Sequence, residues 1–153
     1  MVIEIVPAYN RIGEVRELLT EYTTWLGLDL GFQHFDEEFA TLPGKYAPPL
    51  GRLLLAVKGQ DAAGCVALRR HSTDTAEMKR LFVRPACRSL GIGRLLVETA
   101  SREAREAGYS RIILDTHASM ENSVALYRDI GFTDIPPFYH NPHPGVLYLG
   151  MDL

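Results

Sequence analysis

Residues 81 to 96 read Leu-Phe-Val-Arg-Pro-Ala-Cys-Arg-Ser-Leu-Gly-Ile-Gly-Arg-Leu-Leu. An apolar strand ends at a proline, and a basic loop with two glycines follows it and leads into an amphipathic helix. The first turn of a helix has backbone N–H groups without intrahelical partners and carries a partial positive charge. Gly91 and Gly93 lack Cβ atoms, so a phosphate group can approach this backbone closely. Arg88 and Arg94 flank the loop and can add charge-assisted hydrogen bonds, so the stretch predicts a diphosphate site.

Two common diphosphate motifs do not fit this loop. A P-loop is excluded because no Gly-Lys-Ser/Thr sequence closes it. The Rossmann fingerprint requires Gly or Ala three residues after Gly93, and Leu96 stands there. The pattern that remains is Arg88-x-x-Gly91-x-Gly93, five residues after a strand that ends at Val83.

This pattern resembles the cofactor motif of the GNAT superfamily of acyl-CoA-dependent N-acyltransferases, which reads Arg/Gln-x-x-Gly-x-Gly/Ala. Asn122 and residues 125–132, Ala-Leu-Tyr-x-x-x-Gly-Phe, resemble a second hallmark of that family. The resemblance covers residues 52–135 well, and the N-terminal third only by the order of its elements. Many members have Gly after the arginine, whereas this chain has Ser89, which still offers its N–H group.

The composition is that of an ordinary globular protein, and residues 1–153 are expected to form a single domain. The hydrophobic fraction is 46%, and the formal charge of −3 indicates neither nucleic acid nor an anionic membrane as a partner. Cys65 and Cys87 are too few for a disulfide framework and are expected to be small buried or half-buried thiols. With no signal peptide and no membrane-spanning apolar run in the sequence, we expect a cytoplasmic protein.

Hydrophobic periodicity and turn residues divide the chain into alternating strands and helices. This order, with a strand hairpin before the glycine loop, predicts an α/β fold in which helices cover both faces of a mixed sheet. The resemblance implies the GNAT fold, whose central sheet is mostly antiparallel. Ser119 is expected to cap the last helix. We predict strands at 2–6, 52–58, 63–71, 76–83, 111–116, 132–138 and 146–152, and helices at 11–26, 32–41, 92–107 and 119–130.

The resemblance also implies which residues bind acetyl-CoA, the expected co-substrate. The main chain of Leu81 and Val83 would pair with the pantetheine amides, and an N–H group there could polarise the acetyl carbonyl. The side chains of these two residues are expected in the core. The complete implied set is Leu81, Val83, Arg88, Ser89, Leu90, Gly91, Ile92, Gly93, Arg94, Asn122 and Tyr127.

Acyl transfer from a thioester to an amine requires a base, a polarised carbonyl and an acid for the departing thiolate. Glu77, eleven residues before Arg88, resembles the glutamate that acts as the base in several family members, directly or through water. Alternatively, Glu77 is one of the charges on a solvated strand face, or it pairs with Lys79 or a nearby arginine. Tyr127 resembles the family tyrosine that protonates the CoA sulfur, and the ordinary phenol pKa near 10 suits that role. Alternatively, Tyr127 is an apolar-face residue of its helix.

The expected reaction is direct attack of a primary amine on acetyl-CoA in a ternary complex, with a small-molecule or amino-acid-like acceptor. The loops at 28–50 and 136–146 are expected to shape the acceptor pocket. The acidic run Asp36-Glu37-Glu38 could attract a cationic amine. Alternatively, it is a solvated face. Candidate lining residues are Phe32, Tyr46, Tyr139 and His140.

No metal is expected, because His140 and His143 have no third ligand nearby and a solvated loop is the simpler interpretation. His71 and His117 lie at strand ends, where they could line a cleft. Two other functions stay open: a non-catalytic acyl-CoA-binding or regulatory module, and a transferase for a longer acyl group or an oxygen acceptor. A monomer and a homodimer are both compatible with the sequence.

Overall fold

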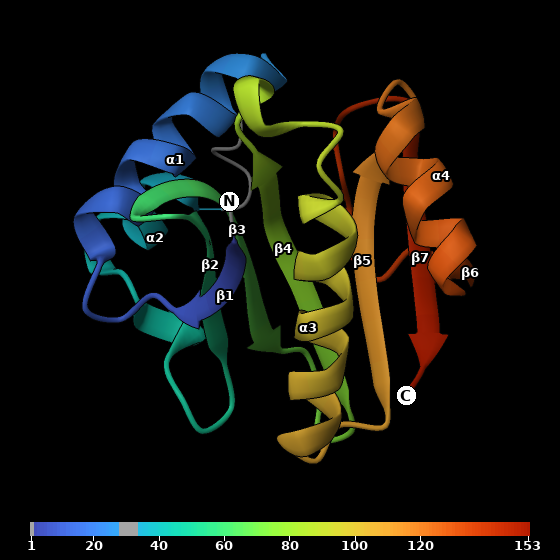
Figure 1. Ribbon diagram of the computed structural model, residues 1–153. Helices are drawn as coiled ribbons and strands as arrows, with labels where there is room; N and C mark the ends of the chain where they lie inside the picture. Colours follow the sequence, from blue (N-terminus) through green and yellow to red (C-terminus); the bar gives the residue numbers. More distant parts are fainter. Residues whose placement is uncertain (1, 28–33) are drawn as a thin grey trace.

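The computed structural model describes residues 2–27 and 34–153, and within them a seven-stranded sheet has the order β1-β2-β3-β4-β5-β7-β6 (Figure 1). The strands are β1 Ile3–Pro7, β2 Arg52–Lys58, β3 Asp61–Arg70, β4 Thr75–Val83, β5 Arg111–His117, β6 Thr133–Asp134 and β7 Val146–Asp152. The α-helices are α1 Ile12–Leu26, α2 Phe35–Thr41, α3 Ile92–Glu106 and α4 Glu121–Ile130, and short 3-10 helices, η2 and η3, lie at Gly44–Tyr46 and Pro85–Cys87.

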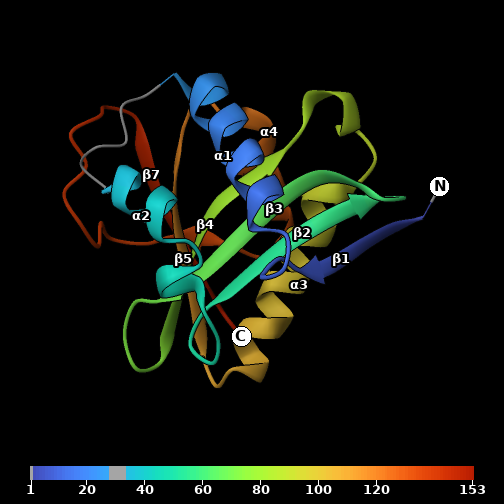
Figure 2. The same ribbon diagram turned by 90° about the vertical axis from the view of Figure 1, so that its left-hand side faces the viewer.

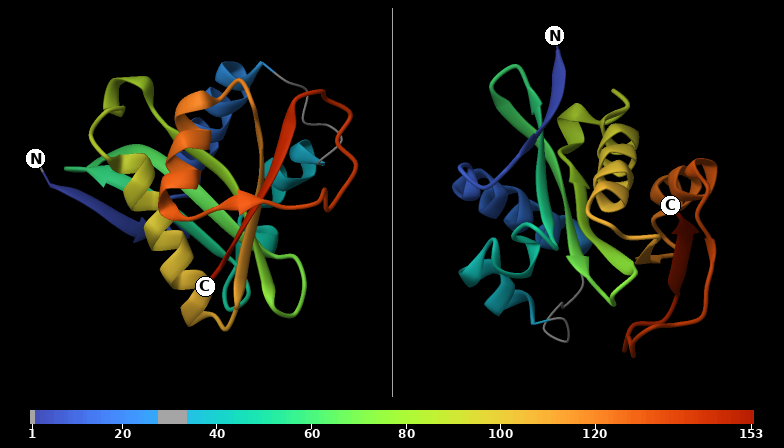
Figure 3. Two further views of the ribbon diagram at one scale, coloured as in Figure 1. Left: turned by 90° about the vertical axis from the view of Figure 1, so that its right-hand side faces the viewer. Right: turned by 90° about the horizontal axis from the view of Figure 1, so that it is seen from below.

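Helices cover both faces of the sheet, as predicted. Helices α1 and α2 lie on one face, and α3 and α4 lie on the other (Figures 2 and 3). Successive side chains of a strand point to opposite faces, so the strands supply two cores. Leu54 of β2 belongs to the core beneath α3, whereas Leu53 and Leu55 belong to the core beneath α1.

The sheet is mostly antiparallel, which confirms that prediction. The β1–β2, β2–β3, β3–β4, β5–β7 and β6–β7 pairs are antiparallel, and β4 and β5 are parallel. The short hairpin between β2 and β3 and the crossover through α3 between β4 and β5 account for this mixture.

Strands β4 and β5 separate along their length, which positions the site. They pair only between Thr75–Glu77 and Arg111–Ile113. On the other side of β4, the register with β3 shifts between Cys65 and Ala67, and Arg80 has a φ of 63°. A bulge of this kind bends the strand that contains it. The carboxyl-terminal half of β4 therefore diverges from β5.

Most predicted elements are confirmed to within a few residues, but two predictions are wrong. The strand expected at 132–138 is reduced to Thr133–Asp134. Pro136 and Pro137 have no N–H group to donate to β7, so the ladder cannot extend through them. Ser119 does not cap α4, because its hydroxyl hydrogen bonds to Nδ1 of His117 at 2.7 Å and the helix begins at Glu121.

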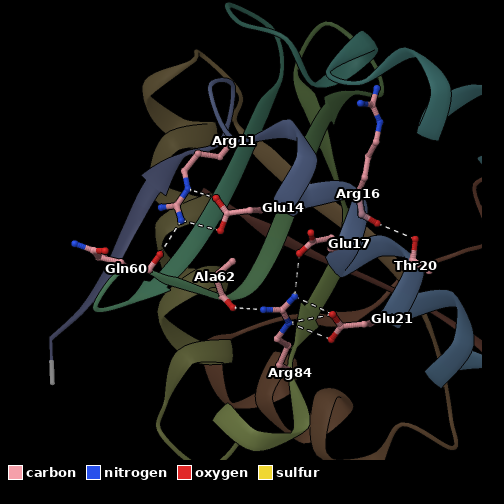
Figure 4. Close-up of polar contacts among 9 residues, drawn as sticks. All are labelled: Arg11, Glu14, Arg16, Glu17, Thr20, Glu21, Gln60, Ala62 and Arg84. Carbon is pink, nitrogen blue, oxygen red and sulfur yellow. Dashed lines mark hydrogen bonds and ion pairs between the residues drawn. The ribbon is translucent and has the colours of Figure 1, made fainter.

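Ion pairs hold α1 against the sheet (Figure 4). Arg84, just after β4, donates hydrogen bonds to Glu21 at 2.8 Å and to the carbonyl of Ala62 at 2.8 Å. At the other end of the helix, Arg11 contacts Glu14 and donates to the carbonyl of Gln60 at 2.9 Å. These contacts fix the helix that carries Tyr22 and Trp25 to the site described below.

None of the helices in the described part of the chain has the length and apolar character needed to cross a membrane.

Candidate functional site

A groove of about 760 Å³ runs along the end of β4, the glycine loop and the first turns of α3 and α4. Most of the predicted cofactor residues line it: Leu81, Val83, Arg88, Ser89, Gly91, Ile92, Gly93, Arg94 and Asn122. Leu90 belongs to the same loop, but its side chain is exposed and does not line the groove. The structure thus brings together in one groove residues that lie on a strand, a loop and two helices.

The glycine loop has the backbone geometry of an anion site. Ser89 and Gly91 have φ values of 68° and 77°, in the left-handed region. Left-handed residues in a turn direct successive N–H groups into a concave nest that binds anions. Helix α3 begins at Ile92, and Gly91, its N-cap, supplies no side-chain acceptor for the helix N–H groups. A left-handed conformation costs a non-glycine residue about 1–2 kcal/mol, so Ser89 holds a conformation that glycine adopts more readily.

Two arginines border the nest in different surroundings. The Arg88 guanidinium lies over the Trp25 ring, 4.8 Å from its centroid, and Nε donates to the carbonyl of Val83 at 3.1 Å. Arg94 forms ion pairs with Asp129 and, at 3.9 Å, with Glu98. Arg88 therefore contacts both Trp25 in the groove wall and Val83 at the end of β4. These are the surroundings in which the family resemblance predicts the cofactor.

We expect CoA to change the fluorescence of Trp25, the single tryptophan of the chain. Trp25 lines the groove beneath Arg88, so a diphosphate that draws this guanidinium away changes the charge over the indole. Titration of the protein with CoA should give a saturable change in tryptophan emission. The same titration of Arg88→Gln should require a higher CoA concentration, and an unchanged emission at saturating CoA would contradict this placement.

A second cavity, of about 80 Å³, lies where β4 and β5 diverge. Leu81, Met120 and Ser123 line both this cavity and the groove, so the two meet at these residues. Tyr127 lines the smaller cavity, and burial raises the pKa of its phenol. The predicted acid therefore lies beside the junction of the two cavities and keeps its proton at neutral pH.

The Glu77 side chain is almost fully buried and forms ion pairs with two basic residues. It accepts a hydrogen bond from Nε of Arg69 at 3.0 Å and lies 3.7 Å from Nζ of Lys79. Lys79 does line the cavity, and its pKa is lowered to about 8 by burial and by the neighbouring charge of Arg80. Glu77 itself does not line the cavity. The ion pairs anticipated as one alternative are present, whereas a position on a solvated strand face is wrong, because the side chain is buried.

The predicted acceptor residues are only partly brought together. Tyr46 is buried in the core beneath α1, and His140 is exposed, so neither lines the cavity; the placement predicted for them is wrong. Tyr139 contacts the site through Asp115, to which its hydroxyl donates at 2.7 Å. Phe32 lies outside the described residues.

The acidic run at 36–38 and the two histidines at strand ends each have defined surroundings. Glu38 binds Arg80 in a bidentate pair at 2.8 and 2.9 Å, so its charge is matched within the protein, whereas Asp36 and Glu37 are exposed. His117 lines the cavity. His71 instead packs against the ring of Phe138.

Several site residues escaped sequence analysis. Trp25 resembles an ordinary apolar-stripe residue of α1, and Asp115 and Asn141 stand outside the recognised motifs. Only the non-local meeting of β5, α1 and the 135–145 loop reveals them. Within the described residues, no group of three or more His, Cys, Asp or Glu side chains is arranged to hold a metal ion.

Comparison with known proteins agrees with this geometry. The family model described as "Acetyltransferase (GNAT) family" matches residues 12–132. An N-acetyltransferase of Schizosaccharomyces pombe is 39% identical over 93% of this chain and 88% of its own length. The chain belongs to the GNAT acetyltransferase family. It is accordingly an acyl-CoA-dependent N-acyltransferase.

Solved GNAT structures share the fold. An acetyltransferase from Streptococcus agalactiae has a TM-score of 0.82 and 25% identity, covering 99% of this chain and 98% of that one. A GNAT family acetyltransferase from Elizabethkingia anophelis, solved with acetyl-CoA bound, has a TM-score of 0.59 and 24% identity over 67% of this chain and 76% of its own. The predicted GNAT fold is confirmed.

Proposed function

We propose that this GNAT protein transfers the acetyl group of acetyl-CoA to a primary amine of a small-molecule or amino-acid-like acceptor, by direct attack within a ternary complex. The observation that carries the proposal is the meeting of the groove and the smaller cavity at Leu81, Met120 and Ser123, beside Tyr127. A thioester at this junction is reached from the groove, and an amine reaches it from the cavity between β4 and β5.

The groove residues fit the diphosphate and pantetheine of CoA. The nest at Ser89–Gly91 and the first turn of α3 present N–H groups, and a Cβ at Gly91 would meet no protein atom within 4 Å, so this approach is open. The acetyl-CoA complex of the Elizabethkingia anophelis GNAT acetyltransferase supports the same co-substrate for this chain.

Each chemical role falls to a named group. The amine forms the C–N bond with the acetyl carbon, and the C–S bond breaks. Main-chain N–H groups near Leu81 hold the developing oxyanion, and Tyr127 gives its proton to the sulfur. Glu77 takes the proton that the amine loses, through a water molecule or Lys79, because Glu77 does not line the cavity and Lys79, which does, lies 3.7 Å from this carboxylate.

The proposal is tested in two steps with the purified protein. Thermal unfolding with CoA and with acetyl-CoA should give a clear rise in midpoint, since a ligand at a hundred times its Kd adds about 2.7 kcal/mol of stability. Thiol release from acetyl-CoA should then be followed across a panel of primary amines. A shift with CoA but no thiol release with any amine would contradict catalysis and indicate a binding module, and no shift would contradict the CoA site itself.

A further inference from the structure

The carboxylate of Asp115, on β5, lines the smaller cavity, which is the proposed acceptor site. Ile112 and Leu114 belong to the core on the α3 side, so Asp115, between Leu114 and Thr116, points toward the α1 side. Glu77 of β4 pairs with Ile113 of β5. Lys79 and Asp115 each lie two residues further along these strands, so Lys79 is the β4 residue that corresponds to Asp115 in register. Among the described residues that line this cavity, Asp115 alone carries a carboxylate.

The loop between β6 and β7 holds Asp115 in place. The Tyr139 hydroxyl donates to Oδ2 of Asp115 at 2.7 Å and accepts from Nδ2 of Asn141 at 3.0 Å. Asn141 is held in turn by the backbone N–H of His143 at 2.9 Å, and Tyr148 donates to the carbonyl of Tyr139 at 3.0 Å. This chain of hydrogen bonds orients a charged group toward the cavity, which is an arrangement typical of a binding site.

The charges around Asp115 differ from those around the other acids. Glu38 is matched by Arg80, and Glu77 by Arg69 and Lys79. The hydrogen bond to Asp115 comes instead from a neutral hydroxyl. A cation that enters the cavity therefore finds a carboxylate oriented by a neutral donor. Of the two lining cations, Arg80 pairs with Glu38, and Lys79 lies beside Glu77 and also interacts electrostatically with Asp115.

We propose that Asp115 binds the ammonium form of the acceptor, so that the substrates are slender aliphatic primary amines that are protonated in solution. This inference rests on the proposed function. The cavity of about 80 Å³ is smaller than an engineered cavity of about 150 Å³ that binds benzene. An aminomethyl end fits it and an aromatic amine does not. Asp115 holds the ammonium, and the proton that must leave before attack passes to the base assigned above.

Direct binding of n-butylammonium, compared with 1-butanol of similar shape, tests the proposal on the protein saturated with CoA. Ligand-detected NMR should show n-butylammonium binding to the wild type and weaker binding of 1-butanol. Asp115→Asn should weaken n-butylammonium binding by about 10–100-fold, as expected for a charge-assisted hydrogen bond of about 1.5–3 kcal/mol. CoA binding in the same samples, followed by Trp25 fluorescence, should not change, which also shows that the variant is folded.

Two further variants make the result specific. Tyr139→Phe keeps the carboxylate but removes its hydrogen bond and should weaken n-butylammonium binding less than Asp115→Asn does; it carries the test if Asp115→Asn does not fold. Asp61→Asn removes the same charge from the exposed start of β3, away from the cavity, and should leave binding unchanged. Equal n-butylammonium affinity in Asp115→Asn and wild type, or no binding to the wild type, would overturn the proposal.

The outcome also separates this inference from the proposed function. Binding of n-butylammonium that depends on Asp115, without thiol release from acetyl-CoA and n-butylamine, would support the ammonium site and count against acetyl transfer to such amines. Thiol release that is equal in Asp115→Asn and wild type at subsaturating n-butylamine would support transfer and overturn the role of Asp115.

Discussion

Replacement of Tyr127 by phenylalanine should lower kcat about 100-fold, within the range by which a positioned acid accelerates a reaction. Tyr127 lines the cavity that meets the proposed CoA groove, and burial raises the pKa of the phenol, so the proton is present at neutral pH. Without it the CoA sulfur departs as an unprotonated thiolate. Steady-state thiol release at saturating acetyl-CoA and amine measures the effect.

The substitution should leave CoA binding and folding almost unchanged. It removes one oxygen atom and keeps the ring, which packs against Phe132 at a centroid distance of 5.8 Å. Tyr22→Phe removes a hydroxyl from the α1 side of the same cavity and should affect kcat much less. Tyr109→Phe serves as a stability control, because its hydroxyl donates to the carbonyl of Leu50 at 2.7 Å away from both cavities. A kcat for Tyr127→Phe equal to that of the wild type would remove Tyr127 from the acid role.

The groove proposed to bind the cofactor was predictable because its residues are local in sequence. Residues 81–94 form a strand end, a loop and a helix start in direct succession, and backbone rules determine what such a junction can bind. Even here, the left-handed conformation of Ser89 and the ring of Trp25 over Arg88 required the structure. The conformation of Ser89 depends on the backbone conformation of the whole loop. The contact between Arg88 and Trp25 depends on where the end of α1 packs.

The smaller cavity, the proposed acceptor site, was not predictable because its residues meet only through tertiary structure. The cavity exists because β4 has a bulge at Arg80 and pairs with β5 only as far as Glu77, and neither feature follows from hydrophobic periodicity. Tyr46 illustrates the error. A tyrosine in a Pro- and Gly-rich loop is expected near the surface, yet the ring is buried beneath α1, and burial raises the pKa of its phenol.

Glu77 shows a different limit of sequence analysis. Its position eleven residues before Arg88 placed it correctly on the strand that precedes the loop, but spacing alone could not separate a base from a member of an ion-pair cluster. The structure shows the cluster with Arg69 and Lys79, and the role of Glu77 as base stays a prediction. Glu77→Gln, assayed beside Asp115→Asn, would distinguish a loss in kcat from a loss in acceptor affinity.

Gly93→Asp should raise the stability of the protein while it weakens CoA binding by more than about 100-fold. Gly93 is the second residue of α3, where a negative side chain gains about 0.3–1 kcal/mol from the helix dipole and loss of glycine adds a few tenths. The new Cβ would lie 3.4 Å from Cδ2 of Leu126 and 4.0 Å from Cγ2 of Val83, which are ordinary contacts. The free energy of unfolding should therefore rise by about 1 kcal/mol, measured by denaturant titration without ligand.

The same carboxylate occupies the place of the diphosphate. It competes for the N–H groups of the first helical turn and repels the phosphate charges, so the interaction that stabilises the free helix excludes the ligand. Gly93→Asn, which has nearly the same shape without the charge, should lose much less CoA affinity and gain less stability. CoA titration calorimetry on the three proteins measures the difference. A CoA affinity in Gly93→Asp equal to that of the wild type would show that the diphosphate is bound elsewhere, whereas opposite changes in stability and affinity would show that the start of α3 is the anion site.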